Sequence, residues 1–153
     1  MISVVIGINK VDRFTYAAID SIICQTLKEI ELVIVANGAE YESVASELES
    51  KYQTFSNVMI YKTPIGQLAY ALNKGIELAR FDLIARMDSD DISHPDRLSQ
   101  QLKFMIEKNL DLVGCDINLI DEKDKLIGKR CYPKGNEINK LLPFRNPFAH
   151  NTI

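Results

Sequence analysis

The sequence predicts an α/β fold of three layers, in which helices cover both faces of a mostly parallel central sheet. Two features of the chain favour this architecture. Short, almost wholly apolar segments rich in β-branched residues recur along it, as is typical of strands buried on both faces. Segments with apolar residues at helical spacing alternate with these strands. Because the chain has 153 residues and shows neither a linker nor a repeat, we expect a single domain over 1–153.

Strands and helices are expected to alternate regularly through the first two thirds of the chain. The strands are apolar runs, and the helices carry apolar residues three or four positions apart. In chain order, the expected elements are a strand at 3–9, a helix that begins after Asp12, a strand at 31–36, a helix at 41–53, a strand at 57–62, a helix at 66–79, a strand at 82–87 and a helix that begins near Ser93.

Local signals support the ends of these elements. Asp12 is the expected N-cap of the first helix, and Asn37-Gly38 is a strong turn signal after the second strand. Ser93 is the expected N-cap of the fourth helix, with Pro95 in its first turn. Gly75 is a weak point in the third helix, because glycine is a poor helix former.

The last third of the chain continues the alternation less regularly. Residues 111–120 are expected to form a fifth strand, and residues 125–132 are expected to pair with it as a hairpin. A short helix is expected near 136–142, and NPFAHNTI reads as the start of a further strand. The order of elements predicts a sheet that is mainly parallel.

Composition and charge exclude several classes of protein. The net charge of −3 provides no excess of positive charge of the kind that favours binding of nucleic acid. No apolar run reaches the roughly 18 residues that a membrane span needs, and the N-terminus MISVVIGINK is not a signal peptide. The three cysteines are scattered without CxxC spacing, which favours core thiols in a reducing compartment. We therefore expect a cytoplasmic protein that does not bind nucleic acid.

Three carboxylates follow the fourth strand within four positions. They are Asp88, Asp90 and Asp91, and we call them the acidic cluster. Like charges about 5 Å apart repel by roughly 3 kcal/mol at an effective dielectric near 20. One interpretation is a solvated turn that caps the next helix. The other is a D-x-D site in which Asp88 and Asp90 hold a divalent cation, Mn²⁺ or Mg²⁺, together with substrate phosphate oxygens.

The position of the acidic cluster favours the second interpretation. In open α/β sheets a ligand binds beyond the carboxyl ends of the strands. Asn9, Asn37 and the acidic cluster each follow a different strand, so we expect them to converge at one edge of the sheet. An EF-hand loop is excluded, because its sixth and twelfth positions, counted from Asp88, are Ser93 and Ser99.

The chain resembles the family 2 glycosyltransferases with the GT-A fold, above all bacterial enzymes of capsule, exopolysaccharide and lipopolysaccharide assembly. The resemblance covers nearly the whole chain, and the run from ALNKGIELA to DSDDISHPDRL is its most specific part. The matching stretches are SVVIGIN, AAIDSIICQTL, ELVIVANG, GQLAYALNKGIELA, IARMDSDD with SHPDRL, and NPFAHNTI.

The resemblance implies transfer of a sugar, with inversion, from a nucleotide-sugar donor to a saccharide or lipid-linked acceptor. The donor is most often a UDP-sugar, and peripheral association with the inner face of a membrane is compatible with this role. Asp88 would lie near the ribose and the metal, and Asp90 would be the main metal-side carboxylate. Asp91 would support the site or face the acceptor. His150, in an Asn-Pro-Phe-x-His stretch that recurs in the family, would face the acceptor or the metal, and the alternative is a plain polar contact. The expected donor-binding residues are Ile8, Asn9, Asn37, Asn73, Asp88 and Asp90.

The chain departs from the family pattern at three places that bear on how the nucleobase of the donor is bound. Many members carry P-x-Y-N after the first strand, where this chain has Gly7-Ile8-Asn9-Lys10. Many carry Asp-Asp-Gly after the second strand, where Ala36-Asn37-Gly38 stands here. Asn37 can form hydrogen bonds with a uracil edge, but it is no carboxylate. Leu72 replaces the arginine that often precedes Asn73.

The general base of the family is expected beyond Ile153, so the resemblance implies a chain truncated at its C-terminus. This chain would then carry donor binding without the base. One alternative is a module that binds a nucleotide and transfers nothing. Another is a sugar-nucleotide pyrophosphorylase, but INKVDRF after the first strand lacks the glycine-rich phosphate loop of that class.

Overall fold

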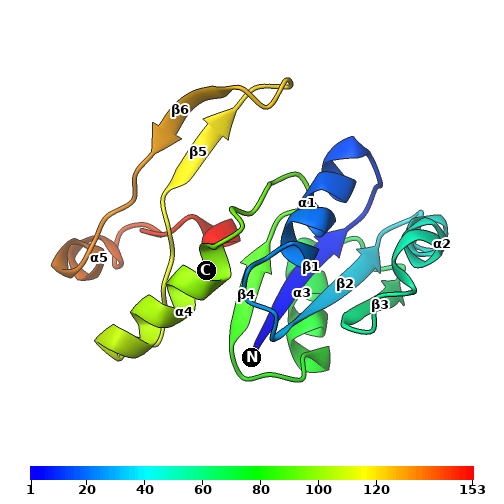
Figure 1. Cartoon of the computed structure of the whole chain (residues 1–153), viewed down its shortest axis with the longest axis horizontal. Coiled ribbons are helices and arrows are strands. Elements are labelled where there is room, and N and C mark those ends of the chain that lie inside the picture. Colours follow the sequence, from blue (N-terminus) through cyan, green and yellow to red (C-terminus); the bar gives the residue numbers. More distant parts are fainter. The chain divides into compact units, whose positions relative to one another are not determined.

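The computed structural model describes residues 1–153 and divides them into two compact units, Met1–Gln100 and Gln101–Ile153. The first unit contains a four-stranded parallel sheet with the strand order β3-β2-β1-β4 (Figure 1). The predicted α/β alternation is confirmed for all four of these strands. In chain order, the elements of this unit are β1 (Ile2–Ile8), α1 (Arg13–Ile23), β2 (Ile30–Asn37), α2 (Tyr41–Tyr52), β3 (Val58–Thr63), α3 (Leu68–Leu78) and β4 (Ile84–Met87).

The two central strands are buried on both faces, which explains their continuous apolar sequences. Every residue of β2 is buried, and Val4, Val5 and Ile6 of β1 are at most 1% exposed. The edge strands β3 and β4 are partly exposed. Helix α3 packs on β1 and β2, and α2 packs on β2 and β3. The core of this unit therefore lies at β1 and β2.

Helix α1 begins as the sequence predicts. The Asp12 carboxylate accepts hydrogen bonds from the backbone N–H groups of Phe14 (2.9 Å) and Thr15 (3.1 Å). The Thr15 hydroxyl in turn accepts from the Asp12 backbone N–H (3.3 Å), which completes a capping box. The hydrogen bond from Thr15, together with that from Phe14, holds the pKa of Asp12 below its ordinary value.

A buried carboxylate stabilises the edge of the sheet at which its parallel strands begin. Glu31 of β2 is 2% exposed and accepts hydrogen bonds from the Ser3 hydroxyl (2.6 Å) and the Arg80 backbone N–H (2.6 Å). The Arg80 guanidinium also pairs with it. Burial alone would raise the pKa of Glu31, but these hydrogen bonds and the Arg80 charge outweigh burial and lower the pKa.

Replacing Glu31 with glutamine is expected to lower the free energy of unfolding at neutral pH by about 1–2 kcal/mol, because hydrogen bonds to a charged group are the stronger ones. Solvent around the exposed Arg80 side chain limits the loss. Since folding lowers the pKa of Glu31, its contribution is present above the ordinary pKa and is lost as pH falls through the folded-state pKa. Urea unfolding across this pH range should show the two proteins converging in acid. A constant difference would assign the loss to packing instead.

The predicted fifth strand is wrong in its length and in its place. The structure has only β5 (Ile117–Ile120), which pairs antiparallel with β6 (Leu126–Arg130) in a separate two-stranded sheet. The expected hairpin is therefore confirmed, but it does not extend the parallel sheet. The backbone before β5 is bound by side chains of its own unit. Gln101 Nε2 donates to the Val113 carbonyl (3.3 Å), and the Cys115 N–H donates to the Thr152 hydroxyl (3.2 Å).

The remaining elements of the chain are helical. Helix α4 (Arg97–Lys108) crosses from the first unit into the second, and α5 (Asn136–Leu141) matches the short helix expected there. His150–Thr152 forms the 3-10 helix η1, so the strand expected in NPFAHNTI is wrong. The Thr152 hydroxyl is bound to the Ala149 carbonyl (2.9 Å), which favours the tight turn over an extended segment.

The structure shows how exposed the cysteines are and whether any helix could span a membrane. The three cysteines are free, as expected, but Cys24 and Cys131 are exposed and Cys115 is only half-buried. The prediction of core thiols is therefore wrong. None of the helices combines the length and the apolar character that crossing a membrane requires.

Candidate functional site

The acidic cluster forms where β4 ends. Carboxylate oxygens of Asp88, Asp90 and Asp91 all lie within 4.8 Å of one another, although Asp90 is exposed and the other two are half-buried. β4 runs parallel to β1 with Met87 beside Ile6, so both strands end at the same edge of the sheet. Three mutually close carboxylates repel one another strongly. This arrangement is therefore suited to a group that supplies positive charge.

One cationic side chain already touches the acidic cluster. Arg86 of β4 donates from Nη2 to Asp88 Oδ1 (2.6 Å), and its side chain is 11% exposed. Burial raises the pKa of the Asp88 carboxyl above its ordinary value. The Arg86 charge opposes that rise, and the charges of Asp91 and Asp90 add to it. The Arg86 charge therefore does not outweigh burial, and the pKa of Asp88 stays raised.

The donor set of the acidic cluster fits a hard divalent cation. Mg²⁺ and Mn²⁺ take oxygen ligands and are commonly held by one or two carboxylates plus phosphate oxygens. Each of the three aspartates offers one oxygen in mutual reach. The exposed position of Asp90 leaves its carboxylate accessible to an incoming ion and its ligand.

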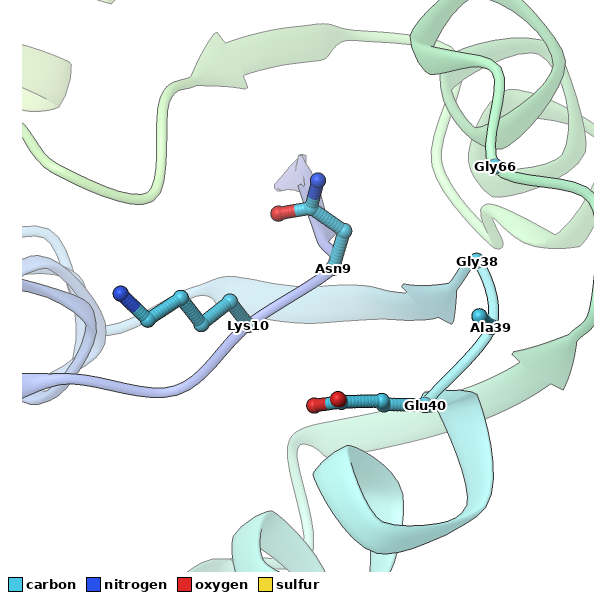
Figure 2. A pocket seen from close by; sticks show the side chains of 6 residues that line it. All are labelled: Asn9, Lys10, Gly38, Ala39, Glu40 and Gly66. Carbon is cyan, nitrogen blue, oxygen red and sulfur yellow. The ribbon is translucent and has the colours of Figure 1, made fainter.

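A pocket of about 440 Å³ opens at the same edge of the sheet, beyond the ends of β1, β2 and β3. This volume is in the range of small-molecule sites. Figure 2 shows the Lys10 amine and the Glu40 carboxylate extending toward the same side of it. The pocket therefore combines an amide, an ammonium, a carboxylate and bare backbone. Its lining residues are Asn9, Lys10, Gly38, Ala39, Glu40 and Gly66.

Two glycines shape the pocket. Gly38 has a φ of +95°, a backbone conformation that side chains with a Cβ rarely adopt. A Cβ on Gly66 would lie 3.3 Å from the Gly38 Cα, so the two loops approach closely here, as Figure 2 shows. The turn signal Asn37-Gly38 in the sequence thus corresponds to a turn on which the pocket depends.

The expected donor-binding residues occupy different environments. Asn9 is exposed and lines the pocket. Ile8 is fully buried at the end of β1, and Asn37 is 4% exposed at the end of β2, directly before Gly38. Asn73 is exposed on α3 and is not among the lining residues.

The residues expected to face the acceptor fall into separate units. Asp91 belongs to the acidic cluster of the first unit. His150 lies in the second unit, where it is an exposed residue of η1.

Three polar or backbone positions of the pocket were not expected from the sequence. Lys10 and Glu40 are ordinary surface residues in sequence, and nothing in their spacing marks them. Gly66 precedes α3, and its closeness to Gly38 depends on how β2 and β3 are paired. The available signals were that Lys10 directly follows Asn9 and that Glu40 follows the turn Asn37-Gly38 by two positions.

A parallel α/β sheet with a pocket and a carboxylate cluster at the carboxyl ends of its strands is typical of nucleotide-binding α/β proteins. The sequence profile described as "Glycosyl transferase family 2" matches residues 3–152 of the chain. The chain therefore belongs to this family.

Curated relatives include proteins of polysaccharide biosynthesis. The O-antigen biosynthesis glycosyltransferase WbnJ of Escherichia coli is 42% identical over 153 residues, which are 100% of this chain and 60% of WbnJ. The amylovoran biosynthesis glycosyltransferase AmsE of Erwinia amylovora is 31% identical over 137 residues, which are 88% of this chain and 51% of AmsE. The chain thus spans between about half and three fifths of the length of these relatives.

Solved structures confirm the predicted GT-A fold. S. aureus TarS 1-349 in complex with UDP-GlcNAc has a TM-score of 0.62 at 18% identity, over 71% of this chain and 32% of TarS. The mannosyltransferase PcManGT from Pyrobaculum calidifontis, in complex with GDP-Man and Mn²⁺, has a TM-score of 0.58 at 17% identity, over 80% of this chain and 36% of PcManGT.

Proposed function

We propose that this chain forms the donor-binding part of a metal-dependent glycosyltransferase of cell-surface polysaccharide synthesis. The donor is a nucleotide-sugar, most simply a UDP-sugar, and the acceptor is a saccharide or a lipid-linked saccharide. The observation that carries the proposal is the acidic cluster at the end of β4, at the same sheet edge as the pocket, in a chain of glycosyl transferase family 2. The complexes of TarS with UDP-GlcNAc and of PcManGT with GDP-Man and Mn²⁺ support the same class of ligand.

In this proposal Asp88 and Asp90 hold the cation, which is Mn²⁺ or Mg²⁺. The bound cation would supply Lewis-acid stabilisation of the nucleoside diphosphate that leaves. Arg86 keeps one oxygen of Asp88 in place through its Nη2 hydrogen bond. The half-buried position of Asp88 limits access of water to that carboxylate.

The pocket receives the nucleoside in this proposal. Asn9 and the backbone around Gly38 line it, and Asn37 directly precedes Gly38 at the end of β2. Amide groups both donate and accept hydrogen bonds, which matches the alternating edge of a pyrimidine base. Asn73 on α3 is assigned to the same ligand. Ile8 is fully buried directly before Asn9, and we assign it the role of supporting Asn9.

The acceptor side is assigned to Asp91 and His150. Transfer with inversion needs a base that removes a proton from the acceptor hydroxyl while this hydroxyl attacks the anomeric carbon. No residue of this chain is assigned that role here. A lipid-linked acceptor would place the protein at the inner face of a membrane.

The experiment that tests donor binding is thermal unfolding with UDP, GDP, CDP or dTDP, each with and without Mn²⁺. A ligand present at about 100 times its dissociation constant adds roughly 2.7 kcal/mol of stability. We expect UDP to raise the melting temperature only when Mn²⁺ is present. Stabilisation by another nucleotide would change the assigned base but keep the site. No stabilisation by any pair of nucleotide and metal would contradict the proposal.

A further inference from the structure

The segment that follows the acidic cluster is attached to the end of helix α1. Residues 93–99 lie about 70 positions away from residues 21–26 along the chain, yet hydrogen bonds connect the two segments directly. The Ser93 N–H donates to the Ser21 hydroxyl (2.9 Å), and the Thr26 N–H donates to the Pro95 carbonyl (2.9 Å). We call this contact the α1 latch.

Gln25 is the centre of the α1 latch. Gln25 is 0% exposed, so its side-chain amide has no access to water. Nε2 donates to the His94 carbonyl (2.7 Å) and to the Ser93 hydroxyl (3.2 Å) of the attached segment, and to the Ser21 carbonyl (3.1 Å) of its own helix. Oε1 accepts from the Leu98 N–H (3.1 Å). Both ends of this buried amide are therefore used, and three of the four contacts reach the distant segment.

The contact with Leu98 provides a hydrogen-bond partner for the start of helix α4. Helix α4 begins at Arg97, and the first N–H groups of a helix have no partner within it. Gln25 satisfies one of them from another part of the chain. The Ser93 hydroxyl accepts from Gln25, and α4 begins four residues later, so the predicted role of Ser93 as N-cap is wrong.

The acidic cluster lies on a short segment, a bridge of the chain whose two ends are held by the sheet and by the α1 latch. The first is Met87, which pairs with Ile6 in the sheet. The second is Ser93, which is 4% exposed and bound by both Ser21 and Gln25. Residues 88–92 span the distance between them and carry all three aspartates. The conformation of so short a bridge depends on where both ends are held.

We propose that Gln25 is a positioning residue for the cation site, which acts through Ser93 and the start of α4 to hold Asp90 and Asp91 against Asp88. This inference rests on the proposed function of the acidic cluster. Groups behind metal ligands commonly change metal affinity by about 10–100-fold when they are replaced. Gln25 is neutral, so its loss changes the geometry of the site without changing its charge.

The test compares Mn²⁺ binding by variants of the full 153-residue chain. Gln25→Met keeps the length of the side chain and removes all of its hydrogen bonds. We expect it to raise the dissociation constant for Mn²⁺, measured from the electron paramagnetic resonance signal of the free ion with and without UDP, by about tenfold. Ser21→Ala removes the acceptor of the Ser93 N–H and the hydrogen bond that the same hydroxyl donates to the Ala18 carbonyl (2.7 Å) within α1, and it leaves Gln25 in place. It should change the constant in the same direction by a smaller factor, and it decides the question if Gln25→Met does not fold.

Glu31→Gln is the matched control for stability. It removes a buried charge at the amino-terminal edge of the sheet, so it should lower the melting temperature and leave Mn²⁺ binding unchanged. Replacing a residue that only stabilises the fold should have the same effect as Glu31→Gln. Gln25→Met, in contrast, should lower the affinity for Mn²⁺ in protein that is fully folded. If Gln25→Met and Ser21→Ala both fold and bind Mn²⁺ with wild-type affinity, the inference about Gln25 is overturned, whereas the proposed function is not. A wild-type chain that binds no Mn²⁺, with or without UDP, overturns the proposed function and the inference with it.

Discussion

Replacing Asp90 with asparagine is expected to abolish Mn²⁺-dependent nucleotide binding, with a loss of more than about 100-fold in affinity, because removing a metal ligand costs more than removing a group behind it. Asparagine keeps the shape of the side chain and removes the charge that a hard divalent cation prefers. Asp90 is also the exposed carboxylate of the acidic cluster, whereas Asp88 is already bound to Arg86. The measurement is the shift in melting temperature with UDP and Mn²⁺ together.

The same substitution should not damage the fold. Without metal, the variant is expected to be as stable as the wild type or more stable by up to about 1 kcal/mol, since it removes repulsion from a surface site screened by solvent. Asp82→Asn is the matched control, because Asp82 is an exposed aspartate just before the other end of β4. It should leave binding unchanged. Full Mn²⁺-dependent binding by Asp90→Asn would remove Asp90 from the metal site.

Replacing Gly75 with alanine is expected to destabilise the protein by about 1–2 kcal/mol, although alanine is the better helix former. A Cβ at this position would lie 2.3 Å from Val5 Cγ1 and 3.5 Å from Val35 Cγ2. Alanine gains roughly 1 kcal/mol of helix propensity. Forcing an extra carbon into a packed core costs about 1–3 kcal/mol, and a separation this short requires α3 or β1 to move. Urea unfolding measures the difference.

A compensating substitution identifies the cause of that loss. Val5→Ala removes the methyl group that the new Cβ would meet, at the cost of a cavity. The double variant Val5→Ala/Gly75→Ala should therefore be more stable than the sum of the two single losses predicts. Strict additivity would show that the contact between α3 and β1 is not the cause. A more stable Gly75→Ala variant would show that α3 moves away from the sheet at little cost.

The first four strands and their helices were predictable because each depends on signals within a few residues. Continuous apolar runs predicted β1 and β2, the two strands that the sheet buries on both faces. Asp12 and Thr15 lie three positions apart in a capping box, so their contact is also local. The acidic cluster was found in the same way, since its three carboxylates lie within four positions.

The fifth strand and the cap of α4 were mispredicted for the opposite reason. Residues 111–116 have an apolar pattern, but side chains of Gln101 and Thr152 occupy backbone groups that a strand would need. Ser93 has the local surroundings of an N-cap, but its hydroxyl is bound by Gln25. In both cases the competing partner lies too far along the chain for a local pattern to indicate it.

The sequence by itself determined the family, the α/β class, the order of the first elements and the carboxylates that mark the candidate site. Only the tertiary structure decided which loops meet at the pocket, where Gly38 lies against Gly66. It also decided that the amide of Gln25 holds the segment after the acidic cluster. Periodicity and capping are written in neighbouring residues, whereas the partner of a buried polar group is fixed by the path of the whole chain.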